Sequence, residues 1–211
     1  MIDDSKSMGA AGPLALSALA TMATALSRLE VGELAVCSFA ERVSLLHPFW
    51  RPWSEDAGAR VMASFGFTEG QTRLGASLEA VESVFLAARS GSAGGGGGGS
   101  SGAQVLQLCF VVSDARIDSE NREALDGTVR RLSEQNILVV LIIIDKNADA
   151  KDSIFNTRSV EFRGDRVVTT AYLDNFPFPY YLAIQRLEAL PDVLCEALKG
   201  WFELVNAQLK A

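Results

Sequence analysis

Apolar residues recur along the chain in two different patterns. In the first, leucines, valines and methionines return every three or four residues, a spacing that places them on one face of an α-helix. In the second, the run is almost continuously apolar, which is typical of parallel strands buried on both faces of a sheet. The first pattern predicts helices over residues 13–29, 72–89, 119–136 and 190–205, and the second predicts strands over residues 105–113 and 137–144.

A hairpin and an initial strand complete the predicted order. Residues 33–49 (ELAVCSFAERVSLLHPF) indicate two short strands around a tight turn at Ala40–Arg42, and Met1 and Ile2 read as the end of a strand before the first helix. Alternating strands and helices imply a doubly wound α/β fold with a mainly parallel sheet, helices on both faces and one antiparallel edge strand. We expect residues 1–211 to form one domain.

Composition narrows the classes of protein and partner. The 211 residues are 48% hydrophobic and 21% charged, enough for one ordinary core. The net charge of −7 disfavours nucleic acid and anionic membranes as direct partners. No apolar run is long enough to span a bilayer and no signal segment precedes the first aspartates, so we expect a monomeric intracellular domain. Three cysteines without metal-binding spacing are expected to be reduced core residues: Cys37, Cys109 and Cys195.

A glycine-rich segment interrupts the predicted alternation. Residues 90–103 (SGSAGGGGGGSSGA) are typical of a flexible loop or of an engineered replacement for a longer insertion, with a tether for a partner as the alternative. The helix before this segment runs away from the carboxyl ends of the strands. We therefore expect the segment to lie at the end of the sheet that is remote from any site.

Oxygen-bearing side chains gather where the predicted strands end. Asp3, Ser5 and Ser7 form a D-x-S-x-S motif after the first strand, Thr72 begins the second long helix, and Asp114 closes the strand at 105–113. Ligands of open α/β sheets bind beyond the carboxyl ends of the strands, so these side chains are expected to converge. Carboxylates and hydroxyls without sulfur or imidazole suit a hard ion such as Mg²⁺, with Mn²⁺ or Ca²⁺ as substitutes.

The alternate spacing of the first motif has a geometrical meaning. In an extended turn every second side chain points the same way, so Asp3, Ser5 and Ser7 would face one point while Asp4 and Lys6 face elsewhere. Neutral hydroxyls leave part of the charge of a cation uncompensated. Such an ion is expected to take an anionic ligand from outside the chain.

Simpler interpretations exist for the same residues. Asp3, Asp4 and the neighbouring serines could form an N-terminal cap for the helix at 13–29. Thr72 could cap the helix that follows it, a role compatible with metal ligation. His47 is the single histidine of the chain and is expected to be a packed or surface residue, not a catalytic one.

The three pieces together resemble the metal-ion-dependent adhesion site (MIDAS) of von Willebrand factor A domains. The D-x-S-x-S motif, Thr72 within T-x-x-G, and Asp114 after a strand come in the same order as in that family. The resemblance implies direct coordination of Mg²⁺ by Ser5, Ser7 and, in the ligand-competent state, Thr72, with Asp3 and Asp114 often acting through water. It also implies that an acidic side chain of a partner completes the coordination sphere.

Longer segments resemble the C-terminal domain of the midasin family, giant nuclear AAA ATPases that act in maturation of the large ribosomal subunit. That likeness implies that the domain binds ubiquitin-like domains of ribosome assembly factors in the nucleus, through a metal-bridged Glu or Asp. It also implies that a separate ATPase region pulls on the bound factor. Since a von Willebrand A domain has a full central strand before its first Asp, the first strand is expected to be truncated or excised here. The segments are IDDSKSM, LEVGELAVCSF, VSLLHPF, KDSIF and residues 176–205.

Side chains beside the predicted site are expected to contact the partner. Lys6 and Arg73 are sequence neighbours of the predicted metal ligands, and Phe176 and Phe178 belong to the aromatic segment NFPFPYY. These four residues are our predicted partner-binding set. Alternatively, the aromatic segment packs its loop against the last helix.

An enzymatic function is disfavoured. Mg²⁺-dependent hydrolases that form an aspartyl phosphate need a second Asp two residues after the first, and Ser5 stands there. The chain has no G-x-x-x-x-G-K-[ST] phosphate loop. We expect a binding module and not an enzyme. The alternatives are a chelatase-like von Willebrand A domain of another intracellular complex, a Mg²⁺-dependent hydrolase, and, disfavoured by the missing signal and disulfides, an extracellular adhesion domain.

Overall fold

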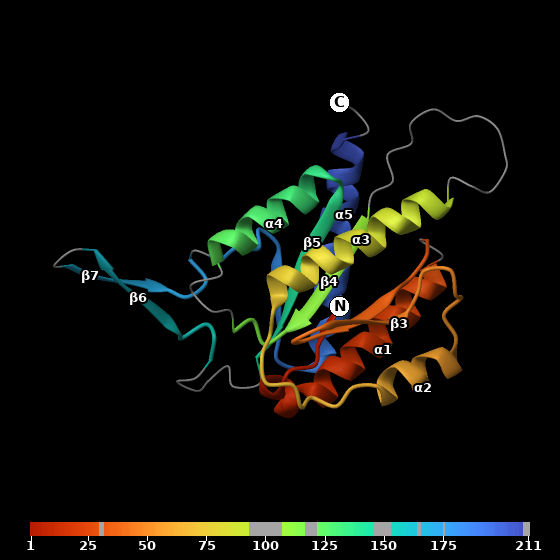
Figure 1. The fold of residues 1–211 in the computed structure, drawn as a ribbon, viewed down its shortest axis with the longest axis horizontal. Coiled ribbons are helices and arrows are strands. Elements are labelled where there is room, and N and C mark those ends of the chain that lie inside the picture. The colour runs from red at the N-terminus through yellow and green to blue at the C-terminus, as the bar shows by residue number, and fades with distance from the viewer. Residues whose placement is uncertain are drawn as a thin grey trace.

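The central feature of the fold is a six-stranded sheet with the strand order β3-β2-β1-β4-β5-β8 (Figure 1). All neighbouring strands pair in parallel except β2 and β3, which form an antiparallel hairpin at one edge. The computed structural model describes residues 1–29, 32–92, 107–116, 122–145, 153–163, 166–174 and 176–208. The strands of this sheet are β1 (Ile2–Asp3), β2 (Val36–Phe39), β3 (Val43–His47), β4 (Gln107–Ser113), β5 (Ile137–Ile144) and β8 (Tyr181–Ile184).

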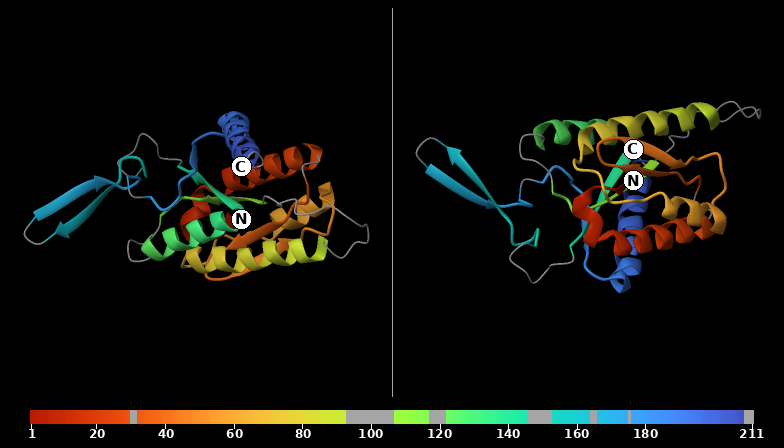
Figure 2. Two further views of the ribbon diagram at one scale, coloured as in Figure 1. Left: turned by 90° about the horizontal axis from the view of Figure 1, so that it is seen from above. Right: turned by 60° about the horizontal axis from the view of Figure 1, so that its bottom comes forward.

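Helices cover both faces of the sheet, as the alternating pattern predicted. Figure 2 shows α3 and α4 on one side and α1 and α5 on the other. The inward side chains form two apolar layers, one built from α3, α4 and the odd-numbered residues of the central strands, the other from α1, α2, α5 and even-numbered strand residues. The helices are α1 (Gly12–Leu29), α2 (Glu55–Ala63), α3 (Leu74–Ser92), α4 (Arg122–Glu134) and α5 (Leu190–Gln208).

A two-stranded hairpin extends beyond the body of the domain. Strands β6 (Arg158–Arg163) and β7 (Arg166–Ala171) pair antiparallel with each other and form a sheet of their own. Figures 1 and 2 show this hairpin projecting from the end of the domain where β4 and β5 finish. The sequence patterns did not predict it, nor α2 or the short edge strand β8.

Several predicted boundaries and locations change in the structure. The hairpin at 33–49, its turn at Ala40–Arg42 and the strand at 137–144 are confirmed. Helix α3 continues through Ser92, so residues 90–92 are helical and not part of a flexible loop, while 93–103 lie outside the described residues. Cys195 is exposed, contrary to the prediction that every cysteine lies in the core, because it falls on the outward side of α5.

The parallel register brings the ends of β1 and β4 together. Ile2 pairs with Ser38 of β2 on one side and with Val112 of β4 on the other. The residues that follow these strands therefore meet at the carboxyl-terminal end of the parallel strands, and that end of the sheet carries the candidate site. Among the described helices, none combines the length and apolar character needed to cross a membrane.

Candidate metal centre

The carboxylate of Asp3 lies at the centre of the candidate site. The side chain is only 1% exposed, and each of its oxygens accepts a hydrogen bond. The backbone N–H of Ser5 donates to Oδ1 over 2.9 Å, and the hydroxyl of Ser113 donates to Oδ2 over 2.6 Å. Because Ser113 is the last residue of β4, this contact fixes the end of β1 against the end of β4.

Burial and hydrogen bonding act in opposite directions on this carboxylate. Desolvation raises the pKa of Asp3, and the negative charge of Asp114 raises it further, whereas the hydrogen bonds from Ser113 and Ser5 lower it. The net direction is upward. A buried carboxylate near a second carboxylate is an environment in which a cation would stabilise the ionised form.

The two serine hydroxyls of the motif lie next to each other. The Oγ atoms of Ser5 and Ser7 are 3.0 Å apart. Ser5 has extended backbone, but Lys6–Ala10 form a 3₁₀ helix, so Ser7 reaches Ser5 through a helical turn and not through the extended turn expected from the sequence. Adjacent ligands of an octahedral ion with bonds of about 2.1 Å are about 3.0 Å apart, so this pair fits two neighbouring positions on Mg²⁺.

Thr72 lies in a loop that runs beside the motif. Ser5 forms a parallel bridge with Glu69, and the N–H of Lys6 donates to the carbonyl of Glu69 over 2.8 Å. At the other end of the loop, the N–H of Arg73 donates to the carbonyl of Ala40, next to the end of β2, over 3.0 Å. Thr72 is half-buried, two residues before α3 begins. The second predicted piece, Thr72, thus reaches the same end of the sheet as the first.

Asp4 holds the start of this loop. Its Oδ1 accepts hydrogen bonds from the N–H groups of Gly66 and Phe67, over 3.0 and 2.6 Å. Phe67 in turn packs against the first turn of α1, where a Cβ at Gly12 would lie 2.6 Å from its ring. Only glycine fits there without displacing Phe67. Asp3 and Asp4 therefore have different partners: Asp3 contacts Ser5 and Ser113, and Asp4 contacts the neighbouring loop.

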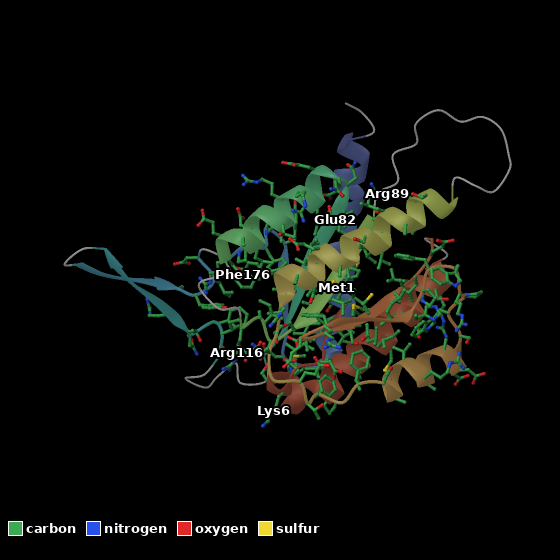
Figure 3. The ribbon with its side chains drawn as sticks, viewed as in Figure 1. Met1, Lys6, Glu82, Arg89, Arg116 and Phe176 are labelled. Atoms are coloured by element: carbon green, nitrogen blue, oxygen red, sulfur yellow. The ribbon has the colours of Figure 1, made fainter. Side chains whose placement is uncertain are left out.

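Asp114 follows β4 directly and is half-buried. Its Oδ1 accepts a hydrogen bond from the N–H of Arg116 over 3.2 Å, and Oδ2 lies 3.7 Å from Nε of the same arginine. The Arg116 side chain is 63% exposed. Figure 3 labels Arg116 and Lys6 at the same end of the domain, so two cationic side chains lie at the end that carries the site.

The predicted partner-binding residues divide into two groups. Lys6 and Arg73 are exposed beside the site. Phe178 is 1% exposed and belongs to the apolar layer of α3 and α4, so the prediction that it contacts a partner is wrong. Phe176 is half-buried, and its ring lies 5.6 Å from the rings of both Phe178 and Tyr181. Phe176 and Phe178 therefore pack on the core of the α3–α4 side, whereas Tyr180 and Tyr181 of the same segment are exposed.

The capping interpretation of the first motif does not fit the structure. Helix α1 begins at Gly12, with the 3₁₀ turn between it and the aspartates. Ser5 precedes that turn, but its side chain makes no capping hydrogen bond. His47 is buried, with Nε2 2.9 Å from the carbonyl of Arg51 and its ring edge-on to Trp53, as expected of a packed histidine.

Sequence reasoning missed Ser113 and Glu69. Ser113 holds Asp3 and also accepts a hydrogen bond from the N–H of Ala115 over 3.2 Å. Glu69 pairs with Ser5 through its backbone and accepts a hydrogen bond from the N–H of Glu41 through its side chain over 2.9 Å. The polar pair Ser113-Asp114 at the end of an apolar strand was a signal for the first residue. No local pattern identifies the second, because its role depends on a loop crossing.

The donor set fits a hard divalent cation. Within the described residues, no group of three or more His, Cys, Asp or Glu side chains forms a metal site, so any ion here depends on hydroxyl groups as well as carboxylates. Asp3, Ser5, Ser7, Asp114 and the Thr72 loop supply oxygen only. That chemistry matches Mg²⁺, Mn²⁺ or Ca²⁺ better than ions that prefer sulfur or imidazole.

Two curated proteins are similar to nearly the whole chain. Midasin of Dictyostelium discoideum is 32% identical over 208 residues, which cover 98% of this chain, and midasin of Giardia intestinalis is 32% identical over 210 residues, which cover 97%. The chain is homologous to a segment of midasin. It spans only 3% and 4% of the length of these two relatives. No protein-family model matches the chain.

Solved structures give the same picture of the fold. Proximal thread matrix protein 1 from the mussel byssus, in a form with a zinc-occupied MIDAS motif, superposes with a TM-score of 0.57 at 15% identity over 92% of this chain and 44% of that one. An aerotolerance-related membrane protein from Bacteroides fragilis has a TM-score of 0.52 at 18% identity over 94% of this chain and 96% of that one. The fold of this midasin homologue is that of the von Willebrand factor A domain.

Proposed function

We propose that the domain is a Mg²⁺-dependent protein-binding module that grips an acidic residue of a ubiquitin-like domain. One observation carries this proposal: Asp3, the Ser5–Ser7 hydroxyl pair and Asp114 lie together where the central strands β1 and β4 end. Mn²⁺ or Ca²⁺ are possible substitutes for the ion. When bound, the metal supplies a positive centre that attracts a carboxylate of the partner.

Each residue of the site has a distinct part in this proposal. Ser5, Ser7 and Thr72 offer neutral hydroxyl oxygens, so little of the cation's charge is neutralised by the chain itself. Asp3 and Asp114 provide negative charge at the base of the site, and Ser113 holds Asp3 in place. Lys6 and Arg73 are exposed beside the site and add positive charge near the acidic residue of the partner.

The proposed partner is suggested by the homology to midasin. As part of a midasin-type ATPase, the domain would recognise ubiquitin-like domains of assembly factors on precursors of the large ribosomal subunit, in the nucleus. Neither nucleic acid nor a membrane is a direct partner in this proposal. The net charge of −7 supports a partner with a basic surface around one acidic residue.

The domain itself is proposed to be non-catalytic. Its donor set contains no carboxylate two residues after Asp3, where aspartyl-phosphate hydrolases carry one, because that position is Ser5. The single histidine, His47, is packed against Trp53. This domain would then bind the partner, and an ATPase in another region of a midasin-type protein would pull on it.

Calorimetric titration of the purified chain with ubiquitin-like domains of large-subunit assembly factors tests the proposal. Binding is expected in Mg²⁺ and is expected to disappear in EDTA. Replacing the acidic loop residue of the partner by its amide should remove binding in Mg²⁺ as well. Affinity that is the same in Mg²⁺ and in EDTA would disprove a metal-bridged contact.

A further inference from the structure

The segment that follows β4 turns at Ala115. This residue has a φ of 58°, in the left-handed region that side chains other than glycine rarely adopt, and it is fully buried in the apolar layer of α3 and α4. A residue with a side chain keeps such a conformation only where its surroundings hold it. Because Ala115 follows Asp114 directly, the groups that hold it also act on the candidate metal centre.

Two hydrogen bonds hold the backbone of Ala115. Its N–H donates to Oγ of Ser113 over 3.2 Å, and the same hydroxyl donates to Asp3. Its carbonyl accepts a hydrogen bond from the hydroxyl of Tyr172 over 3.0 Å. Ala115 and Tyr172 are 57 positions apart, so the second contact is made by the fold and not by the local turn.

The peptide group between Ala115 and Arg116 connects this hydroxyl to a predicted metal ligand. Its carbonyl oxygen accepts from Tyr172, and its N–H, which belongs to Arg116, donates to Oδ1 of Asp114 over 3.2 Å. A peptide group is planar, so a contact that fixes its carbonyl also fixes the direction of its N–H. The position of the Asp114 carboxylate therefore depends on the hydroxyl of Tyr172.

The side chain of Tyr172 is itself held from several sides. Its backbone N–H donates to the carbonyl of Thr157 over 2.9 Å, at the base of the hairpin of β6 and β7. The guanidinium of Arg122, the first residue of α4, lies 4.1 Å from the ring centre, and the ring of Phe176 lies 6.0 Å away. A cation over the ring face and a neighbouring aromatic ring restrict the orientation of the phenol. The hydroxyl thus reaches Ala115 from a side chain whose position is fixed.

We propose that Tyr172 is a positioning residue of the metal centre. Its hydroxyl fixes the peptide group after Ala115, and that peptide group holds the carboxylate of Asp114 in place. The role of Tyr172 rests on the proposed function, in which Asp114 supplies negative charge to a bound cation. Groups that orient metal ligands without binding the metal contribute to metal affinity. Tyr172 thereby sets the affinity of the site for its cation.

Tyr172→Phe tests the hydroxyl, because it keeps the ring and its contacts with Arg122 and Phe176. The probe is Mn²⁺ alone, and its binding to the purified chain is followed through the electron paramagnetic resonance signal of the free ion. The variant should bind Mn²⁺ about 3- to 10-fold more weakly than the unmodified chain, the range expected for one lost hydrogen bond.

Thr128→Val is the matched control. Thr128 is buried midway along α4, and its hydroxyl donates to the carbonyl of Ala124 over 3.1 Å, so the substitution also removes a hydroxyl that donates to a backbone carbonyl. Each variant should lower Tm by about 2–4 °C. Only Tyr172→Phe should weaken Mn²⁺ binding.

NMR spectra without added metal show whether the effect passes through the peptide group. In Tyr172→Phe the amide of Arg116 should exchange at least about threefold faster, because its hydrogen bond to Asp114 is no longer held. The backbone carbon shifts of Ala115 should move away from left-handed values. In Thr128→Val both signals should stay as they are in the unmodified chain.

Equal Mn²⁺ affinity for Tyr172→Phe and the unmodified chain would overturn the role of Tyr172 and leave the proposed function standing. Weaker Mn²⁺ binding with an unchanged Arg116 amide would overturn it too, since the hydroxyl would then act by another route. An equal loss of Mn²⁺ affinity in Thr128→Val would contradict it by showing general destabilisation. If the unmodified chain bound no Mn²⁺, the proposed function would fall, and the role of Tyr172 with it.

Discussion

Ser113 and Asp3 are hydrogen-bonded across the boundary between β4 and β1, with 2.6 Å between the serine hydroxyl and Oδ2 of the aspartate. The two residues are 110 positions apart in the chain. Both are buried, so water does not replace this contact if it is lost. The end of β4 and the start of the site loop are therefore fixed to each other by one pair of side chains.

Ser113→Ala should destabilise the domain without disturbing its sheet. The substitution leaves Oδ2 of Asp3 buried without this donor, which costs about 1–3 kcal/mol of unfolding free energy. Urea denaturation measures the change, and Ser133→Ala on the exposed face of α4 is the matched control. Equal unfolding free energies for the two variants would show that the hydrogen bond contributes little.

Asp114→Ala should separate binding from folding. Asp114 is half-buried in a loop beyond β4, and its charge opposes ionisation of Asp3, so its removal should leave circular dichroism close to that of the unmodified chain. Mg²⁺-dependent affinity for the ubiquitin-like partner should fall by at least about 30-fold. The control is Glu134→Ala at the other end of α4. Global unfolding of the Asp114 variant would contradict a site that is separable from the core.

The sequence predicted the long elements because their signals are local. The long amphipathic patterns and the apolar run at Ile137–Ile144 do not depend on distant contacts, so the four long helices, the central strands and the hairpin of β2 and β3 were identified. Strand β8 has four residues and exists through its pairing with β5, from Leu141 to Ile144. No local pattern encodes such a pairing. The short helix α2 was missed although Ser54 caps it and Glu55 and Asp56 lie in its first turn, and the hairpin of β6 and β7 was missed although its two strands pair with each other.

The residues of the candidate site could be proposed from the sequence because each follows a strand or precedes a helix. The geometry that relates them could not be predicted. The 3₁₀ turn after Ser5 and the pairing of Ser5 with Glu69 depend on a loop that crosses from another part of the chain. The misassignment of Phe178 has a related cause, because an aromatic residue between prolines looks the same in sequence whether it faces a partner or the core.

Asp4→Ala should loosen the loop that carries Thr72, although Asp4 is not a predicted metal ligand. Its Oδ1 accepts from two backbone N–H groups, those of Gly66 and Phe67, and the second contact is only 2.6 Å long. Both amides should exchange faster in the variant, and the unfolding free energy should fall by about 1–3 kcal/mol. Asp4→Asn keeps an acceptor oxygen and should retain most of the protection. Unchanged amide exchange at Gly66 and Phe67 in the alanine variant would show that Asp4 does not hold the loop.

The buried cysteines should be unreactive toward alkylating reagents. They should also make the stability of the domain fall as the pH rises above about 9. Burial raises the pKa of Cys37, and it raises the pKa of Cys109 from 9.0 to about 11. Between these values the folded chain binds more protons than the unfolded chain, so the contribution of Cys109 to stability is complete below about pH 9 and declines as the pH rises toward 11.

Thiol alkylation at pH 8 checks the first part of this prediction. Cys195 is exposed and should react at once, whereas Cys37 and Cys109 should react only after denaturant is added. Urea denaturation at pH 8 and pH 10.5, compared between the unmodified chain and Cys109→Ala, checks the second part. The loss of stability with pH should be smaller in the variant. Rapid labelling of all three thiols under native conditions would contradict the burial.

The proposed contact with the partner predicts a coupling between Thr72 and the partner's acidic residue. If that residue is a Glu, Glu→Gln in the partner keeps its shape and removes its charge. The loss should cost about 2–5 kcal/mol, which corresponds to about 30-fold to several-thousand-fold in affinity, because the carboxylate is paired in a partly dehydrated site. Thr72→Ala removes one neutral hydroxyl and should weaken binding less.

Both changes act through one ion, so their effects should not add in a double-mutant cycle. Calorimetric titrations of the four combinations, each with Mg²⁺ and with EDTA, measure the coupling. Ser92→Ala at the end of α3 serves as the control, since the helix runs from the site at Leu74 to the other end of the domain. Additive effects of Thr72→Ala and Glu→Gln would mean that the two residues do not share the metal. The exposed cations beside the site, Lys6 and Arg73, would then be the first places to look for the contact.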